Sequence, residues 1–280
     1  MAPPRAPEDR YVQVNGLKFH YLDWGGDGMP PMVLLHGFTT LAWAWHQFAP
    51  AFADSYRVLA LDQRGHGDSE WPQGGDYTTE DHMTDIAGFV DALGLERMVL
   101  IGHSMGGRNA IMYAACFPEK VERLVLVDSR PDNDPQGSEA LKQLITNIPE
   151  QIGSVEELIA ELKQLYPRLP ADMACHLASH GLRETAGGAL TPKYDLRMRQ
   201  QSERAGYGVS DLWFFLGLVA CPTLVVRGVE SLILSGEAAR RMCQVVSESE
   251  LAEIEEAGHL VVQENPASFV AAVRGFLEKV

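Results

Sequence analysis

The chain has 280 residues, of which 46% are hydrophobic and 22% are charged, and this globular composition excludes an intrinsically disordered chain. Lys and Arg number 23 against 38 Asp and Glu, so the formal charge is −15, which opposes binding to nucleic acid or to anionic membranes. The sequence contains no apolar targeting segment and no run near the ~18 apolar residues of a membrane span. We therefore expect a cytoplasmic monomer or homodimer with no nucleic-acid or membrane partner.

Four cysteines are scattered along the chain without a C-x-x-C pair: Cys116, Cys175, Cys221 and Cys243. This spacing suggests neither a disulfide framework nor a zinc cluster. We expect four reduced thiols in the core.

Strand and helix patterns alternate along the first half of the chain. After a loose N-terminal segment at 1–10, two strand-like segments flank Asn15-Gly16, a pair that favours a β-hairpin turn. Apolar runs predict further strands at 31–36, 56–62, 97–102 and 123–128, separated in part by helices at 80–93 and 105–117. Continuous Val, Leu and Ile runs are typical of parallel strands that are covered on both faces.

The alternation stops after Asp128 and resumes at Cys221. Between these positions the patterns predict helices without strands, at 137–148, 155–166, 172–182, 194–203 and 210–218. A strand at 221–228, a helix at 236–246, a strand at 251–254 and a final helix capped by Asn265-Pro266 follow. We predict a sheet domain built from 11–129 and 220–280, with a helical cap at 130–219.

A predicted strand, turn and helix carry the sequence G-H-S-M-G-G at residues 102–107. A G-x-S-x-G pentapeptide in this context is the pattern of a nucleophile elbow, a sharp turn that exposes a serine hydroxyl. Glycines are needed there because side chains would collide with the neighbouring strand and helix. The start of the helix also presents backbone N–H groups to a developing oxyanion. We predict that Ser104 is a nucleophile.

A serine hydroxyl needs a base within hydrogen-bond reach. His259 lies between the last predicted strand and the terminal helix, which places it at the carboxyl edge of the sheet beside Ser104, and we predict that it is this base. His103 is expected to point away from the site. His176 and His180 are four residues apart, a spacing that can bind a metal, but no H-E-x-x-H motif is present and a solvated helix face is the preferred interpretation.

These residues, with L-H-G-F at 35–38 and D-Q-R-G-H-G at 62–67, resemble the α/β-hydrolase family from about residue 11 to the C-terminus. The resemblance implies an α/β fold with a mostly parallel eight-stranded sheet, flanking helices and an inserted helical cap. It also implies that the backbone N–H groups of Phe38 and Met105 form an oxyanion hole. Removing one such donor costs about 3 to 4 kcal/mol of transition-state stabilisation.

The acid that would orient the base is not at the position that is commonest in this family. Many members place it three residues after the glycine that ends the seventh strand, where this chain has Ser231. Two candidates remain, Asp128 at the end of the strand after the nucleophile helix, and Glu230. The sequences at 227–231 and 106–109 resemble hydrolases of the 2-(acetamidomethylene)succinate hydrolase type, whose acid lies on the earlier strand, and this favours Asp128. Ser231 is then free to contact His259 or a substrate.

The resemblance implies the chemistry of a serine hydrolase. His259 takes the proton of Ser104 during attack on a carbonyl, and Asp128 orients His259 and stabilises its charged form. A water molecule then hydrolyses the acyl-enzyme. This mechanism requires neither a metal nor an organic cofactor.

The cap should select the substrate because it covers the site. Trp213, in the aromatic run at 212–216, is a candidate for an apolar pocket, although packing between cap and core explains such residues equally well. Arg108, one helical turn after Ser104, is a candidate partner for a substrate carboxylate or a member of a buried structural pair. We expect a small, partly apolar ester or lactone as substrate.

Other activities remain open because fold does not determine function. Ser104 excludes the aspartate nucleophile of haloalkane dehalogenases and epoxide hydrolases. Amide hydrolases, perhydrolases, hydroxynitrile lyases and carbon–carbon bond hydrolases share the serine triad, although the last usually carry asparagine where this chain has His103. A receptor with this fold that binds a ligand without turnover is an alternative of a different class.

Overall fold

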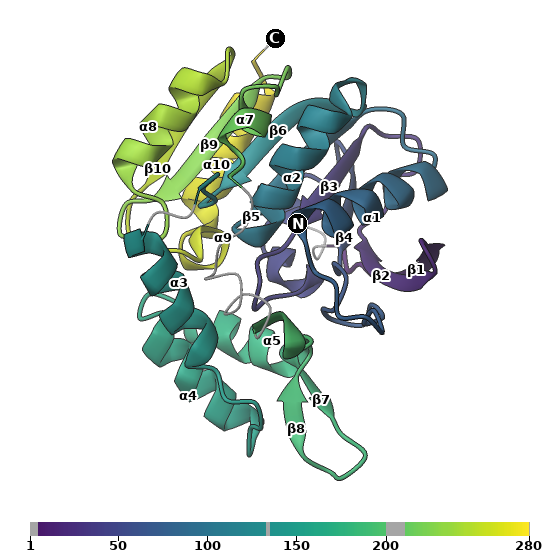
Figure 1. Cartoon of the computed structure of the whole chain (residues 1–280), viewed down its shortest axis with the longest axis vertical. Helices are drawn as coiled ribbons and strands as arrows, with labels where there is room; N and C mark the ends of the chain where they lie inside the picture. Colours follow the sequence, from purple (N-terminus) through teal and green to yellow (C-terminus); the bar gives the residue numbers. More distant parts are fainter. Residues whose placement is uncertain (1–4, 133–134, 200–210, 280) are drawn as a thin grey trace.

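The computed structural model describes residues 5–132, 135–199 and 211–279. Its centre is an eight-stranded sheet with the order β1-β2-β4-β3-β5-β6-β9-β10 (Figure 1). The strands are β1 (Glu8–Val14), β2 (Leu17–Asp23), β3 (Pro31–Leu35), β4 (Arg57–Leu61), β5 (Met98–His103), β6 (Val121–Val127), β9 (Thr223–Gly228) and β10 (Ser249–Ile254). β2 is antiparallel to β1 and β4, and the other neighbours are parallel. The predicted, mostly parallel eight-stranded sheet is confirmed.

Helices cover both faces of the sheet because alternate strand residues point to opposite sides. Val33 and Leu35 face one hydrophobic cluster, and Met32 and Leu34 face the other. The first face is covered by α1 (Thr79–Ala92), α2 (Met105–Cys116), α7 (Trp213–Leu216) and α8 (Gly236–Val245). The second is covered by α9 (Val261–Glu264), α10 (Pro266–Leu277) and the short 3₁₀ helices η1 (Ala42–Trp45) and η2 (Ala49–Ala51).

The N-terminal hairpin forms where the sequence predicted it. Asn15 and Gly16 adopt positive φ angles of 52° and 80°, the conformation that a tight hairpin turn requires. β1 already begins at Glu8 and pairs with β2 along its whole length, so the segment predicted to be loose is shorter than expected. Residues 1–4 lie outside the described part of the chain.

A separate group of elements lies between β6 and β9 and projects from the carboxyl edge of the sheet (Figure 1). It consists of α3 (Pro135–Thr146), α4 (Val155–Leu165), α5 (Ala171–Gly181), β7 (Leu182–Glu184) and β8 (Leu190–Pro192). Its side chains form their own hydrophobic cluster, which also includes Ala44 and Leu260 of the sheet domain. We refer to these elements as the cap.

The cap departs from the sequence prediction at two places. β7 and β8 form a hairpin where only helices were expected, with Gly188 at a φ of +80° in the turn. The helix predicted at 210–218 is reduced to α7, and Leu212 and Leu216 are buried with α2 and α8 against the sheet. Part of the helix predicted at 194–203 lies outside the described residues. The predicted boundaries of the cap stay a prediction.

Not all of the cysteines are buried. All four cysteines are free, but Cys116 and Cys175 are exposed, so the expectation of four core thiols is wrong for these two.

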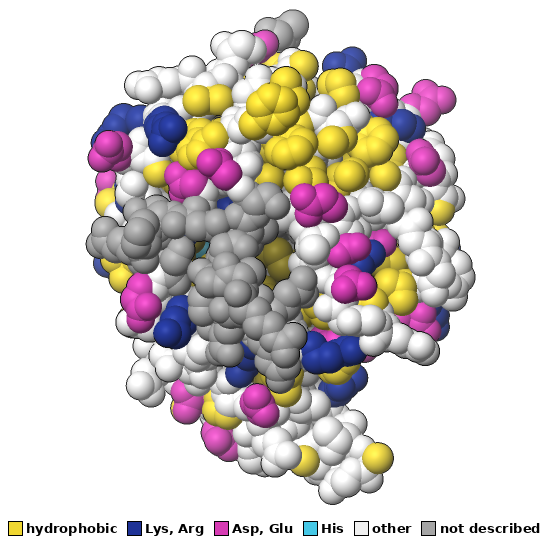
Figure 2. Space-filling view, in the orientation of Figure 1, with side chains coloured by type: hydrophobic (Ala, Val, Ile, Leu, Met, Phe, Trp, Pro, Cys, Tyr) yellow, Lys and Arg dark blue, Asp and Glu magenta, His cyan; other side chains and the backbone are white. Residues whose placement is uncertain are grey.

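Hydrophobic side chains gather on the face over α7 (Figure 2), where Phe214 is 71% and Leu218 is 49% exposed. Among the described helices, none has the length and hydropathy needed to cross a membrane.

Candidate active site

Ser104 lies in a sharp turn between β5 and α2. Its φ and ψ angles are 51° and −115°, a strained conformation for a residue with a side chain. The turn requires glycine at positions 102 and 106, because there is no room for a Cβ atom. A Cβ atom on Gly102 would lie 2.4 Å from the carbonyl oxygen of Gly106, and one on Gly106 would lie 2.4 Å from the carbonyl oxygen of Leu35. The structure therefore forms the strand, turn and helix that the sequence predicted around Ser104.

Asp128 and His259 come together at the carboxyl edge of the sheet. Asp128 follows β6, is fully buried and has a φ of 43°. The Nδ1 atom of His259 lies 2.7 Å from Asp128 Oδ2, while the backbone N–H of Gly228 donates to Oδ1 at 3.3 Å. A carboxylate on Nδ1 leaves Nε2 as the proton-accepting nitrogen of a neutral imidazole.

Ser231 belongs to the same hydrogen-bond network. Its hydroxyl donates to Asp128 Oδ2 at 2.5 Å and accepts from the backbone N–H groups of Ile233 and Leu234. Its described partners do not include His259, and its contact with a substrate stays a prediction. Ser231 instead helps to hold the carboxylate that His259 contacts.

Glu230, the alternative acid, is oriented differently. Its carboxylate accepts two hydrogen bonds of 2.5 Å from the guanidinium of Arg168 on the cap, and Arg168 holds the pKa of Glu230 below its ordinary value. Between the two candidate acids, the geometry brings Asp128 and not Glu230 to His259.

Ser104 and His259 line one cavity at the junction of the cap and the sheet domain, which we call the Ser104 cavity. Its empty volume, including its opening, is about 290 Å³. The described residues that line it are Gly37, Phe38, Thr39, Thr40, His103, Ser104, Leu141, Leu144, Ile145, Tyr166, His259 and Leu260. This wall combines aliphatic side chains with the two groups that could attack and deprotonate, an arrangement typical of small-molecule sites.

The loop after β3 carries Phe38 along the same cavity. His66 Nε2–H donates to the carbonyl of Phe38 at 2.5 Å, and the backbone N–H of Gln63 donates to His36 Nε2 at 3.0 Å. These bonds fix the loop. Among the described residues no hydrogen bond involves the backbone N–H of Phe38 or Met105, so both donors are available, and their role in an oxyanion hole stays a prediction.

His103 was expected to point away, and this expectation is wrong. Its side chain lines the Ser104 cavity, and its Nε2–H donates to the backbone carbonyl of His259 at 2.8 Å. Burial lowers the pKa of His103 to about 3, so the ring is neutral. His103 is thus in a position to orient the loop of His259, and its place next to Ser104 was the only sequence signal for this contact.

Arg108 and Trp213 lie in packing contacts outside the described wall of the Ser104 cavity. Arg108 Nη1–H donates to the backbone carbonyls of Arg130 and Asp132. Trp213 Nε1–H donates to Asp132 Oδ2 at 2.9 Å, and Arg241 stacks on its ring. The structure thus gives both residues structural partners, and their contact with a substrate stays a prediction.

The two cap histidines do not form the solvated face that was expected. The His176 ring stacks on His46 at 4.3 Å, and the His180 ring stacks on Trp43 at 4.0 Å, both across the boundary between α5 and the η1 region. The spacing of residues along a helix does not show whether a face contacts solvent or another element. The sequence therefore did not reveal this packing.

One group of side chains has the composition of a metal site. Ligand atoms of His20, Asp62 and Asp68 lie within 4.8 Å of one another. However, Asp62 already accepts hydrogen bonds from His20 Nδ1–H and from the backbone N–H groups of Ala42 and Asp68, at 2.6 to 3.0 Å. These hydrogen bonds connect β2 to the loop after β4, and they give Asp62 a structural role.

The sequence of this chain is similar to those of known hydrolases. A model of the alpha/beta hydrolase fold family matches residues 30–165. The chain is 29% identical to a 2-(acetamidomethylene)succinate hydrolase of Mesorhizobium japonicum over 89% of this chain and 88% of that protein. It is 40% identical to human epoxide hydrolase 4, but over 42% of this chain and only 33% of that protein.

The agreement with solved structures extends over nearly the whole chain. The crystal structure of E-2-(acetamidomethylene)succinate hydrolase superimposes with a TM-score of 0.90, at 27% identity, over 98% of this chain and all of that one. The order of the strands and the match to the family model agree with this superposition. The chain therefore has the α/β-hydrolase fold.

Proposed function

We propose that this protein is a serine hydrolase that cleaves a carboxylic ester or lactone through an acyl-enzyme on Ser104. The observation that carries the proposal is the 2.7 Å contact between His259 Nδ1 and the buried Asp128, with His259 and Ser104 in the wall of one cavity. A buried carboxylate on Nδ1 orients the imidazole and stabilises its protonated form, which is what a general base beside a hydroxyl requires.

In the proposed reaction, His259 Nε2 takes the Ser104 proton while Oγ forms a bond to the carbonyl carbon. The N–H groups of Phe38 and Met105 stabilise the oxyanion. The tetrahedral intermediate collapses, and protonated His259 gives its proton to the leaving alcohol oxygen. Water, deprotonated by His259, then attacks the acyl-enzyme and releases the acid.

An amide is the second candidate substrate class. Its support is the similarity along nearly the whole chain to a protein whose name describes hydrolysis of an acetamido compound. Attack, oxyanion stabilisation and proton delivery to the leaving atom are the same for both classes, so the residues proposed here serve either reaction.

The direct test is hydrolysis of p-nitrophenyl acetate by the wild type and by Ser104→Ala. We expect the variant to lose a factor of at least about 10⁴ in kcat, because no other group can form the acyl-enzyme. Ser179→Ala is the matched control, since this serine is exposed on α5 and its hydroxyl donates to the carbonyl of Cys175.

Retention of activity in Ser104→Ala would contradict the proposal. A wild type that turns over neither esters, lactones nor amides, yet binds one of them tightly, would instead identify a receptor.

A further inference from the structure

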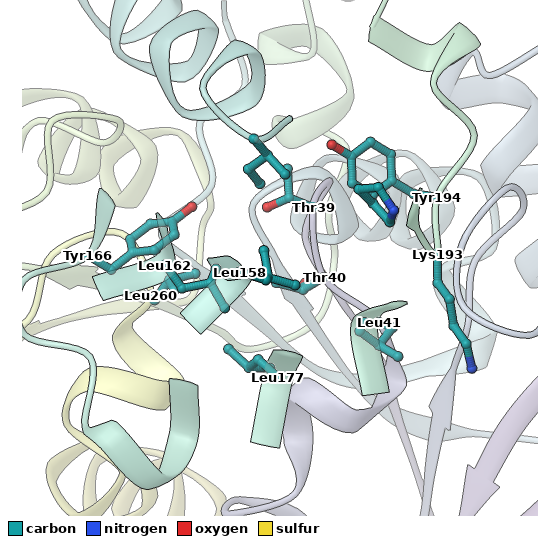
Figure 3. A pocket seen from close by; sticks show the side chains of 13 residues that line it. Thr39, Thr40, Leu41, Leu158, Leu162, Tyr166, Leu177, Lys193, Tyr194 and Leu260 are labelled. Carbon is teal, nitrogen blue, oxygen red and sulfur yellow. The ribbon is translucent and has the colours of Figure 1, made fainter. Parts of the chain in front are cut away.

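A second cavity adjoins the Ser104 cavity between the loop after β3 and the cap (Figure 3). Thr39, Thr40, Tyr166 and Leu260 line both cavities, so these side chains form the partition. The empty volume of the second cavity, including its opening, is about 540 Å³. We call it the leucine chamber, because its wall contains Leu41, Ile148, Leu158, Leu162, Leu177 and Leu260.

The polar groups of this wall already have partners within the protein. The Thr40 hydroxyl donates to the carbonyl of Gly37 at 3.2 Å, the Tyr166 hydroxyl is hydrogen-bonded to Thr39, and the Tyr194 hydroxyl accepts from Arg199. The surface that remains for a ligand is therefore mainly aliphatic. Such a surface favours CH₂ and CH₃ groups over polar ones.

The one charged residue of the wall does not serve the chamber. The ammonium of Lys193 lies 2.8 and 2.9 Å from the two carboxylate oxygens of Asp68. A carboxylate at the end of a bound chain would thus be desolvated among aliphatic side chains, with no unpaired cation among the described residues of the wall, at a high cost.

Described side chains of the chamber wall are buried. Leu41 and Leu177 are each 5% exposed, and Leu260 is 2% exposed. When the substrate is an open-chain ester, the leaving alcohol departs before water attacks, whereas the acyl group remains bonded to Ser104. A chamber with a buried wall beyond the partition suits the part that stays.

We propose that the leucine chamber binds the acyl chain of the substrate, so that the protein prefers esters of uncharged aliphatic acids longer than four carbons. This inference rests on the hydrolase activity proposed above and adds the substrate class to it. The chain would extend from the carbonyl carbon at Ser104 past the four side chains that line both cavities and into the chamber.

The first experiment measures kcat/KM for p-nitrophenyl acetate, butanoate, hexanoate and octanoate. Burial of one CH₂ group corresponds to about 0.8 kcal/mol, or roughly fourfold in kcat/KM. We expect a gain of two- to fourfold per added CH₂ from butanoate onward, until the chamber is full. Ethyl and hexyl acetate form the comparison series, in which the longer chain is on the alcohol and no such gain is expected.

The second experiment changes the chamber. Leu177→Phe fills it, and we expect the ratio of kcat/KM for hexanoate over acetate to fall at least fivefold. Met173→Phe is the matched control, because Met173 is buried one turn earlier on α5 but lines neither cavity; its ratio should stay within twofold of the wild type. Leu158→Ala enlarges the chamber and should move the preferred acid to a longer chain, a gain that misfolding does not produce.

Three outcomes would overturn the inference. If acetate is hydrolysed but kcat/KM falls steadily with acid length, or if the gain appears in the alcohol series, the hydrolase activity stands and the chamber does not bind the acyl chain. If Met173→Phe changes the ratio as much as Leu177→Phe, the effect is not specific to the chamber. Absence of turnover with every ester, lactone and amide would remove the proposed function itself.

Discussion

The environment of Asp128 distinguishes it from every other carboxylate near the candidate site. It is fully buried and is held by His259, Ser231 and the backbone N–H of Gly228. These three hydrogen bonds hold the carboxylate in place beside His259. Ser231 takes part because its hydroxyl donates to the oxygen that also faces His259, which explains how a serine fits the position where many relatives have the acid.

This environment predicts unequal effects for two isosteric substitutions. Asp128→Asn should lower kcat for an ester by about 10³ to 10⁴, because the amide cannot stabilise protonated His259 and favours the wrong tautomer. Glu230→Gln should leave kcat within about twofold, since it removes only a surface ion pair with Arg168. Steady-state kinetics on the folded variants measure both values of kcat. A larger loss of kcat in Glu230→Gln than in Asp128→Asn would assign the acid to Glu230.

The turn between β5 and α2 is the element that depends most strictly on its sequence. The glycines on either side of Ser104 lie where the strand, the helix and β3 approach one another most closely. This explains why a short pattern located the turn correctly: the constraint is steric, it acts between near neighbours, and only glycine satisfies it.

Two glycine substitutions test this explanation. Gly106→Ala should lower the free energy of unfolding by about 3 kcal/mol or more, because its Cβ would lie 2.4 Å from the carbonyl oxygen of Leu35. Gly275→Ala on α10 is the control, since a Cβ there meets nothing within 4 Å, and it should raise the stability by about 0.5 to 1 kcal/mol. Chemical denaturation measures both, and equal effects would refute the steric explanation.

At the scale of the whole molecule, the cap is joined to the sheet domain by both apolar and aromatic contacts. Ala44 and Leu260 extend its hydrophobic cluster into the sheet domain. Nearby, His176 stacks on His46, lies next to His180 and donates from Nε2 to the carbonyl of Trp43 at 3.2 Å. Burial and the two neighbouring histidines lower the pKa of His176 to about 4.

This pKa predicts how acid affects the whole fold. As the pH falls from about 6.5 to 4, the unfolded chain protonates His176 before the folded chain does, so the free energy of unfolding decreases in that window. His176→Phe should therefore show a smaller fall in Tm than the wild type between pH 7 and 4.5. Cys175→Ser is the control on the exposed side of α5 and should follow the wild type. Identical pH slopes for His176→Phe and wild type would contradict the prediction.

Features that depend on near neighbours could be predicted from the amino-acid sequence. The hairpin at Asn15-Gly16, the alternating strands and helices and the sharp turn at Ser104 follow from backbone conformation, periodicity and local sterics. These features were sufficient to predict a mostly parallel sheet covered by helices and the sharp turn at Ser104. The motif around Ser104 and the position of His259 after the last strand also identified the two side chains that line one cavity.

The contacts between distant segments became visible in the folded chain. The fold brought Asp128 rather than Glu230 to His259, turned His103 toward the site, placed Trp213 in packing contacts and formed the leucine chamber from the cap and the loop after β3. The periodicity of the sequence does not encode these contacts. Several of them join residues that lie 80 or more positions apart in the chain. They also depend on side-chain packing, which is fixed only when the sheet and the cap are assembled.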